Sequence, residues 1–146
     1  MNEEARQAAR DRIKERLSEY IDIKGERAQI KLRLEELEGT RTAPGTSNWS
    51  GMPRGGGDSD PMLSGLAQKE RLVEMYQRKD AELLAAQERI ENMIDSLPPR
   101  ARKLMRHKYI EGLNWEPVCV AMGYAWRQTH RIHAAALDML VDMEVG

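Results

Sequence analysis

Two long segments of the sequence, residues 3–38 and 61–97, contain apolar residues that recur at alternating spacings of three and four. In the first segment these are Tyr20, Ile23, Ile30, Leu34 and Leu37, and in the second Met62, Leu66, Val73, Tyr76, Leu83, Ile90, Ile94 and Leu97. Such spacing places the apolar side chains on one face of a helix. Neither segment contains an internal proline. The pattern therefore predicts two long helices, each with a single apolar stripe.

Residues 39–61 between these segments are rich in glycine and proline and contain few apolar side chains. Such a composition sustains neither a helix nor a core, and it predicts a flexible loop. The two stripes then have two ways to become buried. They pack against each other in an antiparallel, coiled-coil-like hairpin, or they pack against a second copy of the chain in a homodimer.

The composition favours an all-α fold. Charged residues make up 32% of the 146 residues, phenylalanine is absent, and glycine and proline are concentrated in one stretch. Many strands and turns would require these breakers along the whole chain. We therefore expect two parts, a helical hairpin over residues 1–96 and a C-terminal three-helix module over residues 97–146.

Proline and glycine divide the C-terminal module into three short helices. Pro98 and Pro99 end the hairpin, and the first short helix is expected over residues 99–110. The second is expected over residues 115–122 and the third over about residues 126–140, with a sharp turn at Gly123 between them. A helix, a tight glycine turn and a second helix form the bihelical unit of a helix-turn-helix.

Charge is segregated towards this module. Residues 97–137 contain seven Arg and Lys against two Glu, a formal charge of +5, whereas the whole chain carries −1. The first two turns of the last helix are polar, and a helix that enters a DNA major groove meets base edges and phosphates with its first turns. The candidate DNA-contacting residues there are Trp126, Arg127, Gln128, His130 and Arg131.

Four further cations precede the bihelical unit: Arg100, Arg102, Lys103 and Arg106. We expect them to attract phosphates without regard to sequence, and a plain solvent-exposed helix face is the alternative for all these polar residues. Trp126 has two alternatives, stacking on a sugar or a thymine methyl group or folding back onto Tyr124. Tyr109, Trp115 and His133 are expected to pack in the core.

Catalytic, metal and cofactor sites are not expected. No serine or cysteine has a histidine and an acid at informative spacing, and the single cysteine, Cys119, has no second cysteine with which to hold a metal. No apolar run approaches the roughly 20 residues that cross a bilayer. We therefore expect a binding protein of the cytoplasm, with no enzymatic activity and no membrane partner.

The module resembles region 4 of bacterial sigma factors, which recognises promoter DNA. The resemblance is carried by Leu97-Pro98-Pro99-Arg100, Tyr109-Ile110-Glu111-Gly112-Leu113, Trp115-Glu116, Met122-Gly123-Tyr124 and Ala136-Leu137. With Ser50-Gly51-Met52-Pro53, the triple glycine and Ser59-Asp60, the whole chain is similar to small phage- and prophage-encoded proteins of Gram-positive bacteria. Their closest functional relatives are the ArpU and RinA type regulators of late genes. The resemblance implies a transcription regulator that binds double-stranded DNA.

Two other functions fit the same pattern. A small terminase subunit, which packages phage DNA, also joins a helix-turn-helix to an oligomerising helical part. A sigma-like module can instead contact host RNA polymerase and have no DNA specificity of its own. A ring of many subunits would indicate packaging, and the absence of salt-dependent DNA binding would indicate the polymerase module.

Overall fold

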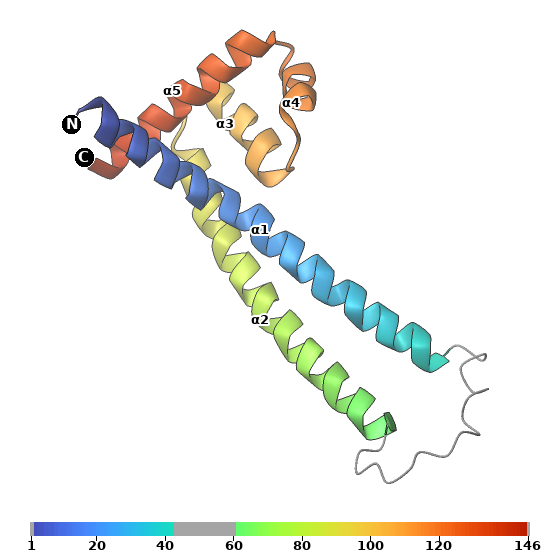
Figure 1. The fold of residues 1–146 in the computed structure, drawn as a ribbon. Coiled ribbons are helices and arrows are strands. Elements are labelled where there is room, and N and C mark those ends of the chain that lie inside the picture. Colours follow the sequence, from blue (N-terminus) through green and yellow to red (C-terminus); the bar gives the residue numbers. More distant parts are fainter. Residues whose placement is uncertain (1, 43–60, 146) are drawn as a thin grey trace. The chain divides into compact units, whose positions relative to one another are not determined.

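The computed structural model describes residues 2–42 and 61–145, and these residues form five α-helices and one π-helical segment without any strand (Figure 1). The prediction of an all-α fold, with a helical hairpin followed by a helical C-terminal module, is confirmed. The chain divides into two compact units. Unit 1 contains Met1–Ile23 and Leu83–Gly146, and unit 2 contains Lys24–Glu82.

The hairpin consists of α1 (Glu3–Thr42) and α2 (Pro61–Asp95). Helix α1 continues four residues beyond the predicted end at Glu38 and passes through Gly39, so the predicted loop over residues 39–61 is too long at its start. A glycine costs only about 1 kcal/mol in a helix, which weakens a helix without ending it. Residues 43–60 of the predicted loop lie outside the described residues.

In unit 2 the two helices run antiparallel and are joined by ion pairs along their length. Arg27 pairs with Asp80, Lys79 with Glu26, and Lys69 with Glu38. Between them Ile30 and Leu72 are buried. Within this unit the stripes therefore pack against each other, which is the intramolecular alternative. The homodimer stays a prediction.

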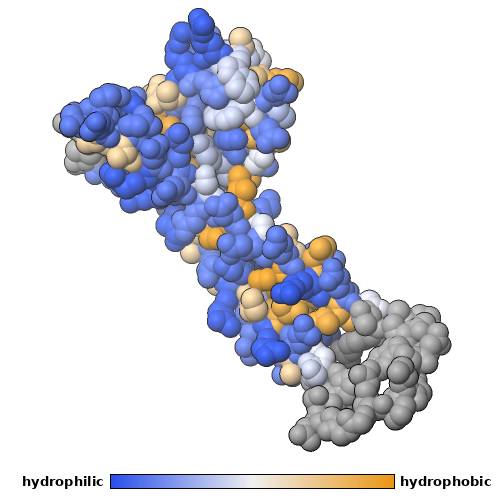
Figure 2. Space-filling view, in the orientation of Figure 1, coloured by the Kyte–Doolittle hydropathy of each residue, from blue (hydrophilic) through white to orange (hydrophobic). Residues whose placement is uncertain are grey.

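The core of unit 2 is thin, and apolar side chains reach its surface. Leu32 and Met75 are 57% and 43% exposed. Figure 2 shows apolar colouring on this part of the hairpin, whereas the visible face of unit 1 is mostly hydrophilic.

Unit 1 has one core to which both ends of the sequence contribute. Ile13 and Leu17 from α1 and Ile94 from the end of α2 are almost completely buried, as are Leu104 and Val141 from the C-terminal module. The compact units therefore do not divide the chain at the predicted boundary between residues 96 and 97. That residues 1–96 and 97–146 are separate folding domains stays a prediction.

The C-terminal helices follow the predicted order. They are α3 (Pro99–Met105), the π-helical segment η2 (Arg106–Ile110), α4 (Trp115–Met122) and α5 (Trp126–Val145). The predicted helix over residues 99–110 is present, but its second half widens into a π-turn in which the Glu111 amide donates to the Arg106 carbonyl at 2.9 Å. Helix α5 extends past its predicted end near residue 140.

Two glycines in left-handed conformations set the turns around α4. Gly112 has φ +73° before the helix, and Gly123 has φ +75° directly after it. At the second turn the amides of Gly123 and Tyr124 both donate to the Cys119 carbonyl, at 2.9 and 3.2 Å. This turn fixes the direction in which α5 begins, as predicted for Gly123.

Replacing Gly123 by alanine is expected to lower the free energy of unfolding by about 1–2 kcal/mol, because an L side chain is strained at positive φ. No heavy atom would contact the added Cβ, so the effect reports backbone strain alone. Gly25→Ala is the matched control. Its Cβ also meets open space, but within α1, so it should raise stability by about 0.5–1 kcal/mol. Urea unfolding measures both, and equal signs for the two variants would contradict the prediction.

Candidate nucleic-acid interface

Helices α4 and α5 follow one another in the chain and form a bihelical unit (Figure 1). The two helices share a buried face. Val118 from α4 and Thr129, Ala136 and Leu137 from α5 are at most 3% exposed. Thr129 also donates its hydroxyl to the carbonyl of Ala125, at 3.0 Å. These residues define the buried side of α5, and the opposite side of the helix faces solvent.

That solvent-facing side begins with unpaired polar groups. Arg127, Gln128 and Arg131 are exposed, and within the described part of the chain their side chains form neither hydrogen bonds nor ion pairs. Ala125 precedes the helix and its side chain has no oxygen to cap the first amides. The helix start therefore combines two free guanidinium groups, a free carboxamide and the positive end of the helix dipole.

A row of aromatic rings connects this surface with the core. Trp126 is 54% exposed, and its ring centroid lies 4.4 Å from that of His130. The ring centroids of His130 and Trp115 are 4.3 Å apart. The ring centroids of Trp115 and His133 are 4.7 Å apart, and His133 stacks on Tyr109 with the centroids 5.8 Å apart. Trp126 therefore packs on His130 and not on Tyr124, whose ring is covered by a guanidinium group.

The inner end of this row is buried, as expected for Tyr109 and His133. The Tyr109 hydroxyl and Nε2 of His133 form a hydrogen bond at 2.7 Å. Burial lowers the pKa of His133 from 6.5 to about 4, with further contributions from Lys14, His130 and Lys108. Burial also raises the pKa of Tyr109 to about 12. At neutral pH both groups are uncharged, which suits a donor and an acceptor inside a core.

The four cations that precede α4 have different surroundings. Arg100 lies 5.4 Å from the ring of Tyr124, and Arg102 donates to the Leu97 carbonyl at 3.2 Å. Lys103 is exposed and has no partner among the described residues. The fourth, Arg106, pairs with Glu91 and Asp95 of α2, at 3.9 and 3.4 Å. Its charge is therefore compensated within the protein, whereas that of Lys103 is available to a ligand.

Lys108 was absent from the predicted site, although it belongs to the basic segment. Its Nζ lies 4.8 Å from the ring of Trp115 and 3.3 Å from the Leu113 carbonyl. Lys108 therefore packs against one ring of the aromatic row. Its contact with Trp115 depends on the turn at Gly112, so no local pattern in the sequence indicated it.

The opposite end of α5 is acidic, and α1 neutralises it. Asp138 accepts hydrogen bonds from Arg10 and Arg6, at 2.7 and 3.1 Å, and Arg10 is the larger cause of the lowered pKa of Asp138. Glu144 pairs with Arg16 at 2.8 Å. The unpaired positive charge of α5 therefore lies at its start.

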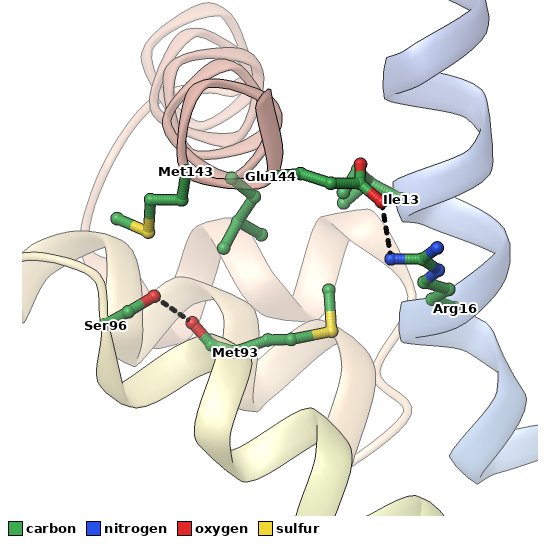
Figure 3. Close-up of a pocket in the computed structure, with 7 residues that line it drawn as sticks. Ile13, Arg16, Met93, Ser96, Met143 and Glu144 are labelled. Carbon is green, nitrogen blue, oxygen red and sulfur yellow. Dashed lines mark hydrogen bonds and ion pairs between the residues drawn. The ribbon is translucent and has the colours of Figure 1, made fainter. Parts of the chain in front are cut away.

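A shallow hollow of about 290 Å³ lies at this neutralised end of α5, far along the helix from Trp126 (Figure 3). The Arg16–Glu144 ion pair crosses one side of it, and Ser96 donates its hydroxyl to the Met93 carbonyl on the other. Its lining consists of Ile13, Arg16, Met93, Ser96, Leu140, Met143 and Glu144. These side chains are apolar or already paired, which indicates a packing hollow and not a chemical site.

The described residues contain no cluster of His, Cys, Asp and Glu that would hold a metal ion. None of their helices combines the length and the apolar character that a membrane span requires. In comparisons with known proteins, no family model, curated protein or solved structure matches this chain. The start of α5, with its unpaired polar side chains, is therefore the feature of the molecule that points to a function.

Proposed function

We propose that the chain is a sequence-specific DNA-binding regulator of transcription that places the first turns of α5 in the major groove. The observation that carries this proposal is the exposed and unpaired state of Arg127, Gln128 and Arg131 at the start of a helix that follows a tight glycine turn. In helix-turn-helix proteins the N-terminal residues of the second helix contact base edges, and the first helix crosses the backbone.

The chemistry of these side chains matches base edges. An arginine makes two hydrogen bonds to O6 and N7 of guanine, and a glutamine makes two to N6 and N7 of adenine. Arg127 and Gln128 present these groups in the first turn of α5, and Arg131 follows one turn later. Lys103 supplies a charge that does not depend on base identity, because it is a single flexible ammonium group.

The biological setting of the proposal comes from the resemblance of the sequence to sigma region 4 and to small phage-encoded regulators. We therefore propose phage or prophage late genes as targets and host RNA polymerase as a second partner. The motif residues Gly112 and Gly123 adopt the left-handed conformations that such a module requires, which supports this assignment.

Replacing Arg127 or Gln128 by alanine is expected to weaken specific binding by about 1–3 kcal/mol and to leave non-specific binding nearly unchanged, because base contacts discriminate between sequences. Lys103→Ala is the matched comparison. It should weaken binding to all duplexes alike and lower the slope of affinity against salt by about one, because one phosphate contact releases about one counterion. Titrations against a selected duplex and random duplexes at several salt concentrations measure both effects.

Unchanged affinity of the Arg127 and Gln128 variants for the selected duplex would show that α5 is not the recognition helix. No salt-dependent binding of any duplex would contradict DNA binding itself and favour a module that contacts RNA polymerase only. Light scattering on the same samples distinguishes a DNA-packaging protein from a transcription regulator. A ring of many subunits would contradict the transcriptional role.

A further inference from the structure

Trp126 differs from its neighbours on the exposed side of α5. Arg127, Gln128 and Arg131 are polar, whereas Trp126 presents a large apolar ring that is 54% exposed. It belongs to the first turn of the helix, as Arg127 and Gln128 do. A ligand that covers the first turn of α5 therefore also meets an indole.

The indole is held in a fixed orientation. The indole packs on His130, with the ring centroids 4.4 Å apart, and His130 also packs on Trp115, with the ring centroids 4.3 Å apart. Trp115 itself contacts the buried His133 at 4.7 Å. A side chain backed by rings that reach the core loses little conformational entropy on binding, so its exposed part is preorganised for a ligand.

The major groove offers one apolar group to such a surface. Guanine, cytosine and adenine present hydrogen-bond donors and acceptors there, and only thymine adds a methyl group, on C5. The rings of stacked bases are not accessible in an intact duplex. An apolar ring beside groups that bind base edges therefore matches thymine.

We infer that Trp126 recognises the C5-methyl group of a thymine and so sets specificity for that base. This inference rests on the proposed function, because it requires α5 to lie in the major groove. It adds a contact that depends on a methyl group to contacts that depend on hydrogen bonds. The two can be separated by experiment, since deoxyuridine keeps the hydrogen-bonding edge of thymine and lacks the methyl group.

The test uses the full chain and a duplex that it selects from a random library. Each thymine of that duplex is then replaced in turn by deoxyuridine. Burial of one methyl group corresponds to about a fourfold change in affinity. We expect the wild-type chain to lose about fourfold at one thymine, and Trp126→Ala to bind the two duplexes equally. Trp126→Gln gives a second variant without an apolar ring, and circular dichroism confirms that both variants are folded.

Val120→Ala is the matched control, because Val120 is an apolar residue of α4 that is 82% exposed. This variant should keep the preference for thymine. Equal binding of the thymine and deoxyuridine duplexes by the wild-type chain at every position would overturn the inference, and the proposed function would stand. A preference that survives in both Trp126 variants, or disappears in Val120→Ala, would also overturn it. If no duplex is selected, the proposed function fails as well.

Discussion

Leu17→Ala is expected to lower the free energy of unfolding by about 2–5 kcal/mol, the range for removal of a fully buried leucine side chain. Leu17 is 0% exposed and belongs to the same core as Leu104 and Val141, although it lies far from both in sequence. Urea unfolding should be followed in parallel by circular dichroism and by tryptophan fluorescence. Both signals should shift together, since Trp115 packs against this core.

Leu32→Ala provides the control on the same helix. Leu32 is 57% exposed, so the same change should alter stability by no more than about 0.5 kcal/mol. Separate shifts of the two signals in the Leu17→Ala variant would support the domain boundary predicted at residues 96 and 97. In that case Leu17→Ala would shift the helical signal and leave the fluorescence transition in place, because the C-terminal module would fold without α1.

The sequence predicted the helices well because their signals are local. Pro99 and Gly123 act through backbone geometry within one or two residues, so α3, α4 and the turn between α4 and α5 begin where they were expected. The buried side of α5 follows the same kind of local signal, since Thr129 and Ala136 lie seven residues apart, at a helical period, and are both buried. Gly39 shows the limit of such signals, because a single glycine did not end α1.

Contacts between distant segments could not be predicted in this way. The stripe of α1 indicated a partner but not which one, and its first half shares a core with the C-terminal helices. Arg106 was expected to attract phosphates, yet it pairs with Glu91 and Asp95, which precede it by more than two helical turns. The row of rings from Trp126 to Tyr109 combines η2, α4 and α5. Helical periodicity within one segment contains no information on such neighbours.

His133 is expected to make the protein lose stability as the pH falls from about 6.5 to about 4. Its pKa is about 4 in the folded protein, whereas a histidine in the unfolded chain has its ordinary pKa of 6.5. Between these values the unfolded chain binds the proton more strongly than the folded chain, so stability rises with pH. One pKa unit corresponds to 1.36 kcal/mol, and the whole interval therefore amounts to about 3 kcal/mol. Above about pH 6.5 His133 is neutral in both the folded and the unfolded chain, so this loss of stability is absent.

His133→Gln tests this contribution, because glutamine accepts a hydrogen bond from the Tyr109 hydroxyl and does not titrate. The variant should be less stable than the wild type at pH 7.5, because it loses the ring contacts with Trp115 and Tyr109. The difference should shrink as the pH falls, since only the wild type has to exclude a proton from this site. Acidic groups such as Asp138 titrate in both proteins and cancel in the comparison. Urea unfolding at pH 7.5, 6.0 and 4.5 measures the difference, and a constant difference would show that His133 is not the group that resists protonation.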